Sequence, residues 1–172
     1  MFDDGLLATA SQLDVGKVAG RFRQLTGKGG FKYLLVPYDL KLAPYNYVFA
    51  TSYGGPNTPY KTGVVSTARL DVSDPTIEHH VGADVTALRV YKLMLKSIAR
   101  LAGLASPERC ILAYPHNLVE LDRKSAEFCP EDHDTLTAAG VLKAQESDTG
   151  DCIQVAERRA PRHLVGIGLM DH

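Results

Sequence analysis

Four cations recur at three- and four-residue steps in the middle of the chain: Arg89, Lys92, Lys96 and Arg100. On a helix that turns about 100° per residue, they fall within an arc of about 80°. Protonated guanidinium and ammonium groups donate hydrogen bonds and have no lone pair for a metal ion. The pattern by itself favours the solvated polar face of an amphipathic helix.

A second group of residues has metal-binding types: Glu78, His79, His80 and Asp84. Adjacent histidines point in different directions on any regular element, so the sequence favours a polar loop that leads into a helix. The chain has no G-x-S-x-G motif, no S-x-x-K motif with partner motifs and no glycine-rich phosphate loop. Neither a serine hydrolase nor a nucleotide-binding protein is therefore predicted.

The three cysteines, Cys110, Cys129 and Cys152, are an odd number at irregular spacing. This is a poor disulfide framework and favours a reducing compartment. The start of the chain does not resemble a secretory signal, and no stretch reaches the roughly 18 apolar residues of a membrane-spanning helix. We therefore expect a cytoplasmic protein with no membrane partner. A net charge of −1 also gives no general attraction to nucleic acid.

Hydrophobic periodicity predicts one α/β domain over residues 1–143 and a tail over 144–172 that is either disordered or an added edge strand. Asp84 is the expected N-cap of the helix that carries the four cations, and Gly103 is expected to end it. The predicted helices cover residues 11–26, 85–102 and 130–143, and the predicted strands cover 31–37, 45–51 and 62–70.

Three segments, in order, resemble the archaemetzincins, a family of zinc metallopeptidases. Residues 47–49 and 64–70 are similar to the family's strand pair, which ends in a Ser-x-Ala-Arg-Leu-like run. Residues 89–104 fall where the family has its zinc helix, and the interval from Cys110 to Cys129 is similar to that between two family cysteines. The resemblance covers roughly residues 11–143. It implies a metzincin-like domain: a small twisted mixed sheet with a backing helix, a long central helix and a C-terminal helix.

The zinc motif of that family, H-E-x-x-H-x-x-G-x-x-H, is degenerate in this chain. Aligned on Gly103, the two helical histidines correspond to Lys96 and Arg100, the glutamate to Ser97 and the third histidine to Ser106. Two protonated cations repel Zn²⁺, and a serine hydroxyl cannot act as a general base near neutral pH. The resemblance therefore implies that no catalytic zinc binds here and that peptidase activity is lost.

The resemblance also implies an accessory zinc site, which the family builds from four cysteines. Two of them correspond to Cys110 and Cys129, and the others fall near Pro107 and at Asp132. Together with His133, the remaining groups could hold Zn²⁺ in a residual structural site. The alternative is that the two cysteines are free thiols, which pack as small apolar groups.

In the family, the histidine side of the zinc helix faces the substrate cleft. Lys96 and Arg100 would then line the cleft and hold a carboxylate of the protein, an anionic ligand or a peptide C-terminus. We expect a binding module without peptidase activity. The alternatives are a hydrolase with a rebuilt metal site and a truncated, decayed family member. Few residues precede the first helix, so an edge strand is expected to be missing, and residues 164–170 could supply it.

Overall fold

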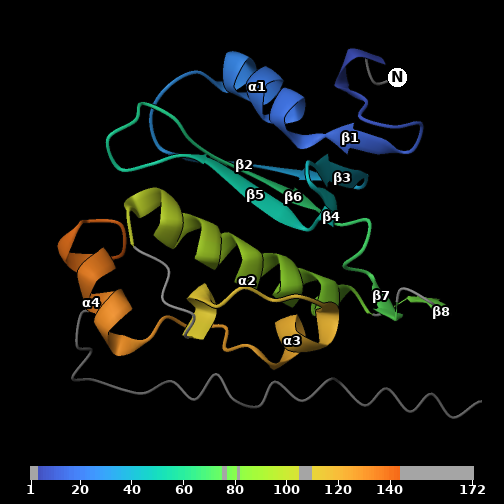
Figure 1. Cartoon of the computed structure of the whole chain (residues 1–172). Helices are drawn as coiled ribbons and strands as arrows, with labels where there is room; N and C mark the ends of the chain where they lie inside the picture. Colours follow the sequence, from blue (N-terminus) through green and yellow to red (C-terminus); the bar gives the residue numbers. More distant parts are fainter. Residues whose placement is uncertain (1–3, 75–76, 81, 105–109, 144–172) are drawn as a thin grey trace, which may run out of the picture.

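The computed structural model describes residues 4–74, 77–80, 82–104 and 110–143, and for residues 4, 73–74 and 77–80 it describes the backbone alone. Figure 1 shows the elements in layers: α1 lies above the strands, the long helix α2 lies beneath them, and α3 and α4 lie below α2. The helices are α1 (Val15–Thr26), α2 (Ala83–Ala102), α3 (Leu118–Arg123) and α4 (Pro130–Ala138), with single 3₁₀ turns η1 (Asp4–Leu6) and η2 (Cys110–Leu112).

The described strands form two three-stranded mixed sheets and a two-stranded hairpin. In the first sheet, β3 is central, with β1 parallel on one side and β4 antiparallel on the other. In the second, β6 is central, with β2 parallel on one side and β5 antiparallel on the other. The strands are β1 (Gln12–Asp14), β2 (Phe31–Val36), β3 (Asp39–Leu42), β4 (Tyr45–Val48), β5 (Ala50–Gly54), β6 (Lys61–Ser66), β7 (Val72–Asp74) and β8 (Ile77–His80).

Alternation along β2 sets what each face of the second sheet contacts. Leu34 packs into the cluster of apolar residues beneath α1. Its neighbour Tyr33 points the other way, and its hydroxyl donates to Ser97 of α2 at 3.0 Å. Residues of β2 therefore reach both helix layers, with the odd-numbered ones on the α2 side.

Helix α2 ends where the sequence predicts and begins two residues earlier. Its N-cap is Gly82, so Asp84 is not the cap; it lies in the first turn, where a carboxylate complements the helix dipole. Gly103 takes the left-handed conformation with a φ of 98°. A Cβ there would lie 2.9 Å from Cγ of Pro56. Glycine at 103 therefore ends the helix and also allows the loop between β5 and β6 to pack against the end of α2.

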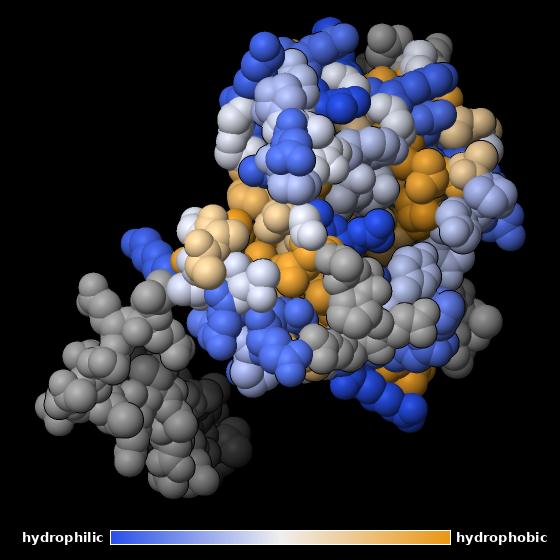
Figure 2. Space-filling view, turned by 60° about the vertical axis from the view of Figure 1, so that its left-hand side comes forward, coloured by the Kyte–Doolittle hydropathy of each residue, from blue (hydrophilic) through white to orange (hydrophobic). Residues whose placement is uncertain are grey.

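Two apolar clusters hold α2 in place. One joins Phe49 and Val65 of the strand region to Leu93 of α2 and Leu121 of α3. The other joins Ala99 of α2 to Ile111, Leu112 and Leu136. Figure 2 shows hydrophobic residues across the middle of one face, between hydrophilic residues above and below. Helix α2 therefore packs against the strands and α3 through one cluster, and against η2 and α4 through the other.

Several predicted boundaries are wrong at the level of a few residues. The first helix begins at 15, because residues 12–14 form β1 and the Asp14 carboxylate accepts from the amide of Lys17 at 3.0 Å. The predicted strand 45–51 is two strands separated at Phe49, and the strand predicted over 62–70 ends at 66. The segments 39–44 and 71–83 contain β3, β7 and β8 rather than only turns. The last helix ends at Ala138, followed by Gly140 with a φ of 68°.

The predicted fold class is confirmed: an α/β domain with a backing helix, a long central helix and a C-terminal helix. The described strands divide between two small mixed sheets and the hairpin, rather than forming one sheet. No described helix has the length and apolar character that a membrane crossing requires. The tail at 144–172 lies outside the described residues.

Candidate functional site

The cationic side of α2 faces inward. Arg89, Lys92 and Lys96 expose only 3%, 4% and 8% of their surface, whereas Leu88 and Tyr91 on the same helix are about half exposed. The expectation of a solvated cationic face is therefore wrong for these three residues. Burial of a charged group is costly unless it is paired and hydrogen-bonded, so each buried cation needs partners.

Arg89 is fully engaged with groups of the protein. Its guanidinium forms a two-pronged ion pair with Asp122, with Nε–Oδ1 and Nη2–Oδ2 distances both 2.7 Å. Its Nη1 donates to the carbonyls of Leu70 at 2.6 Å and Val72 at 2.7 Å. Arg89 therefore links the chain after β6 to the end of α3 and is not free to hold a ligand.

Two lysines bind carbonyl groups of the segment below α2. Lys92 donates to the carbonyls of Leu121 at 3.0 Å and Asp122 at 2.8 Å. Lys124, which the sequence analysis did not single out, donates to the carbonyls of Ile111 and Ala113. These bonds attach α3 and η2 to the rest of the domain. Nothing in their spacing along the sequence would have indicated them.

Lys96 lies between this scaffold and an open cavity. Its Nζ donates to the carbonyl of Ala113 at 3.2 Å and lies 4.6 Å from the ring centre of Tyr114. Burial, together with the charges of Lys124 and Arg100, lowers the pKa of Lys96 to about 8. The ammonium is therefore mostly protonated at pH 7, but it loses its charge far more easily than an exposed lysine does.

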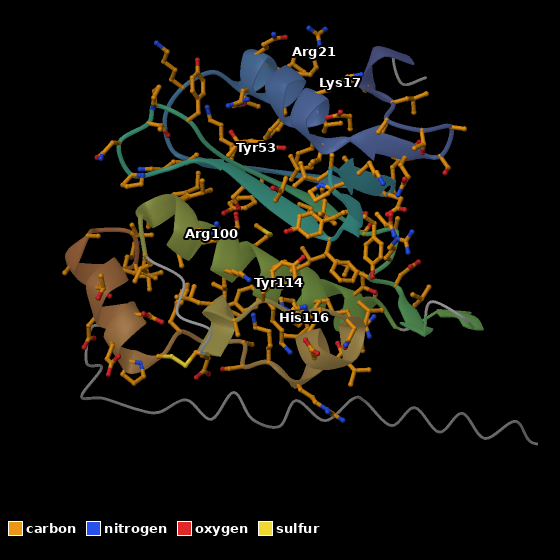
Figure 3. The ribbon with its side chains drawn as sticks, in the orientation of Figure 1. Lys17, Arg21, Tyr53, Arg100, Tyr114 and His116 are labelled. Carbon is orange, nitrogen blue, oxygen red and sulfur yellow. A yellow bond between two sulfur atoms is a disulfide. The ribbon has the colours of Figure 1, made fainter. Side chains whose placement is uncertain are left out.

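A cavity of about 230 Å³ lies between β5, α2 and the segment after η2, and we call it the cation cavity. Figure 3 shows Arg100 on α2, with Tyr114 and His116 on the segment that crosses that helix, whereas Lys17 and Arg21 lie on α1, above the strands. Lys96, Ser97 and Arg100, which the sequence analysis aligned with family motif positions, all line this cavity. Its other walls consist mainly of apolar and aromatic residues from three segments, namely Leu42, Tyr45, Val48, Phe49, Ala50, Leu93, Tyr114 and Pro115.

The two cations of the cavity have no carboxylate partner in the ranges that the structure describes. Arg100 is an exposed residue that lines the cavity. Two positive groups beside an apolar wall, neither of them paired with a described carboxylate, form a place where a carboxylate can bind. Ser106, the fourth motif position, lies outside the described residues.

Ser97 belongs to a cluster of hydroxyl groups. Its Oγ lies 2.5 Å from Oγ of Ser52 on β5 and accepts from the Tyr33 hydroxyl at 3.0 Å. Burial raises the pKa of Tyr33 to about 12. The phenol therefore stays protonated at neutral pH and cannot serve Ser97 as a base. Ser52 and Tyr33 were missed by the sequence analysis, because hydroxyl residues on strands carry no motif.

The predicted residual zinc site takes a different form in this structure. Cys110 and Cys129 are joined in a disulfide that closes a loop of 19 residues. Asp132 is buried on α4, and Nδ1 of His133 lies 3.8 Å from a carboxylate oxygen of Asp134. Within the described ranges, no three His, Cys, Asp or Glu side chains gather as a metal site requires. Zinc binding by the reduced cysteines stays a prediction.

The disulfide differs from the expectation of free thiols. The odd number of cysteines argued against disulfide bonds. The two bonded cysteines nevertheless lie close together, because Cys110 belongs to η2 and Cys129 is the N-cap of α4, and these elements pack against each other. Residues 78–80 lie on β8, rather than in the predicted loop, and their side chains are outside the description.

Solved structures of other proteins share this architecture. An archaemetzincin from Methanopyrus kandleri is 23% identical, over 80% of this chain and 72% of that one, with a TM-score of 0.63. A zinc-dependent peptidase from Methanocorpusculum labreanum is 23% identical, over 79% and 81%, with a TM-score of 0.61. An archaemetzincin from Archaeoglobus fulgidus, solved in complex with malonate, is 18% identical, over 77% and 75%, with a TM-score of 0.57. No model of a known protein family and no curated protein matches the sequence.

The similarity defines the chain first as a protein with the fold of a zinc-dependent peptidase. More particularly, it has an archaemetzincin-like fold, which confirms the resemblance seen in the sequence. At these identities the likeness shows the fold alone. What the chain does depends on the residues of the cation cavity.

Proposed function

We propose that this protein is a non-catalytic binding module, which holds a carboxylate-bearing ligand, such as a peptide C-terminus, in the cation cavity. The observation that carries the proposal is the pair of cations, Lys96 and Arg100, that line one small cavity without a carboxylate partner among the described residues. Both groups donate to carboxylates, and neither ligates a metal ion while protonated.

The shape and lining of the cavity support a ligand with an apolar part. Leu42, Val48 and Leu93 give it an aliphatic wall, and Tyr114 stands beside Lys96. A peptide end offers both components: a carboxylate for the cations and a side chain for the wall. The malonate complex of the A. fulgidus archaemetzincin makes this dicarboxylate a suitable first probe.

The absence of peptidase activity belongs to the same proposal. A zinc peptidase needs imidazole, carboxylate or thiolate ligands and a base that titrates near neutral pH. At the corresponding positions this chain has two cations and Ser97, which is held by Ser52 and Tyr33. We expect protein purified without a chelator to contain no stoichiometric zinc and to cleave no peptide in a chelator-sensitive manner.

Calorimetric titration with malonate tests the proposal. A short apolar peptide with a free C-terminal carboxylate, and the same peptide as its amide, are the second probes. Arg100→Gln should weaken the binding of malonate and the free acid about tenfold or more, because one charged donor is lost. Arg21→Gln, which alters an exposed arginine of α1, is the matched control and should change nothing.

The pH dependence of the same titration reports on Lys96. With a pKa of about 8, this lysine loses its charge as the pH rises from 7 to 9, so malonate affinity should fall over that range. Arg100→Gln should retain the fall, and Lys96→Gln should reduce it to what remains from Lys124, whose pKa is also lowered to about 8. Equal binding of the peptide acid and amide, or unchanged malonate affinity in Arg100→Gln, would disprove the binding site. Chelator-sensitive cleavage would disprove the non-catalytic assignment.

A further inference from the structure

Strand β2 forms one edge of its sheet. Its only strand partner within the described ranges is β6, because the order of the sheet is β2-β6-β5. The other edge of β2 therefore presents backbone amides and carbonyls that no described strand pairs. Such an edge can accept a further strand, and proteins usually cover it.

An apolar groove of about 650 Å³ lies below this edge. Helix α2 packs chiefly beneath β5 and β6, so β2 extends past the flank of the helix. The groove is lined by Leu35 of β2, by Thr67 and Asp71, and by Val90, Tyr91 and Met94 of α2, among others. Leu35 is 48% exposed and Tyr91 is 50% exposed. A strand added to β2 would cover both.

The sequence beyond the described domain contains a segment that suits this groove. Residues 164–170 read Leu-Val-Gly-Ile-Gly-Leu-Met and carry no charge. In an extended conformation, Val165, Ile167 and Leu169 would share one face. The other face would carry two glycines at its centre, which require little space, with Leu164 and Met170 at its ends. Apolar side chains on one face match a groove that lies on only one side of the sheet.

The segment is also long enough to reach the groove. Residues 144–163 separate it from the described domain, and this length of chain spans up to about 66 Å when extended. A domain of this size has a radius of gyration of only about 15 Å. Attachment to the same chain raises the local concentration of the segment to about the millimolar range. This concentration favours it over a second copy or a separate protein.

We propose that residues 164–170 add to β2 as an edge strand, with Val165, Ile167 and Leu169 turned into the groove beneath it. The proposal does not depend on the function of the cation cavity, because the groove lies at the β2 edge of the sheet and the cavity at the opposite edge, beside β5.

Hydrogen–deuterium exchange of full-length protein is the first test. Ile167→Asp should speed exchange of the amides in peptides covering residues 31–36 by about tenfold or more, because the added strand is lost. Ile153→Asp, which alters another apolar residue of the tail, is the matched control and should leave exchange unchanged. Equal exchange in wild type and Ile167→Asp, or an equal increase in both variants, would overturn the proposal.

Cross-linking provides a second test that does not depend on the stability of the domain. In a Cys152→Ser background, Leu35→Cys and Ile167→Cys should form a disulfide within one chain under mild oxidation by oxidised glutathione. Leu35→Cys with Ile153→Cys should not. Intact mass and gel filtration distinguish a cross-linked monomer from a cross-linked dimer. A dimer would show that a second copy fills the groove, and no cross-link would show that the segment lies elsewhere; either result contradicts the proposal.

Discussion

At the scale of single residues, Arg89 shows how a buried charge can hold a small domain together. Its guanidinium satisfies the Asp122 carboxylate and two carbonyl groups at distances from 2.6 to 2.7 Å. Removing one of these hydrogen-bonded groups lowers the free energy of unfolding by more than the interactions contribute to it, because the remaining buried polar groups lose their partners.

We therefore predict that Arg89→Met lowers the free energy of unfolding by about 3 kcal/mol, as measured by urea denaturation. Asp122→Asn should cost less, because the Asp122 side chain is 42% exposed and water can replace part of the interaction. Arg123→Met, an exposed arginine on the same short helix, is the control and should be nearly neutral. Equal effects of Arg89→Met and Arg123→Met would contradict this interpretation.

At the scale of elements, α2 shows what periodicity can and cannot predict. The spacing of Arg89, Lys92, Lys96 and Arg100 correctly placed them on one side of a helix. Which side faces inward was predicted wrongly for three of them, because their partners are mostly main-chain carbonyls of the segments after β6, after η2 and at the end of α3. A carbonyl leaves no trace in a sequence. Long helices and strand centres were predictable because many residues contribute to each pattern.

The family resemblance supplied what periodicity could not. It implied that Lys96 and Arg100 line a cleft, and both residues line the cation cavity. The hydroxyl cluster of Ser97, Ser52 and Tyr33 was not predictable from either source. Its members lie far apart in the sequence, and each is an ordinary strand or helix residue.

The disulfide between η2 and the start of α4 gives a prediction at the element scale. Closing a loop of 19 residues restricts the unfolded chain, which corresponds to about 3 kcal/mol in the loop-entropy model. Replacing both Cys110 and Cys129 by Ser should lower the free energy of unfolding by about that amount. Cys152→Ser serves as the control. No loss of stability in the double variant would show that the bond does not constrain the chain.

The reduced form tests the zinc prediction separately. Reduced protein incubated with Zn²⁺ and then dialysed should retain about one equivalent if Cys110, Cys129, Asp132 and His133 form a site. The Cys110→Ser/Cys129→Ser variant should retain none, and equal zinc content in the two proteins would sink the prediction.

At the scale of the whole molecule, titratable groups whose pKa values are shifted in the fold predict how stability changes with pH. The hydrogen bond from Arg89 holds the pKa of Asp122 below its usual value. Burial raises the pKa of Asp39, but hydrogen bonds from Arg69 and Gln12 more than offset this effect. Both carboxylates therefore stabilise the fold above about pH 4, and this contribution is lost as the pH falls further.

At alkaline pH, two effects of opposite sign follow each other as the pH rises: stability first increases and then decreases. Burial lowers the pKa of Lys96 and of Lys124 from 10.5 to about 8, so between these values the unfolded chain binds more protons and stability rises with pH. The Tyr33 pKa of about 12 is above its unfolded value of 10, so stability falls above pH 10. Urea unfolding of Cys152→Ser protein should show a maximum near pH 10, and Tyr33→Phe should reduce the fall beyond it. A maximum below pH 8 would contradict the assignment.

The contact between Lys96 and the carbonyl of Ala113 has a consequence for any attempt to build a zinc site into this domain. The Lys96 side chain helps to hold the segment after η2 in place. A histidine that bound a metal ion at this position would no longer donate a hydrogen bond to the carbonyl of Ala113. A side chain that holds a neighbouring segment in this way is costly to replace, because the groups that it contacts lose a hydrogen-bond partner. Installing histidine and glutamate at the four motif positions should therefore require compensating changes around Ala113 and Lys124 before the protein folds around zinc.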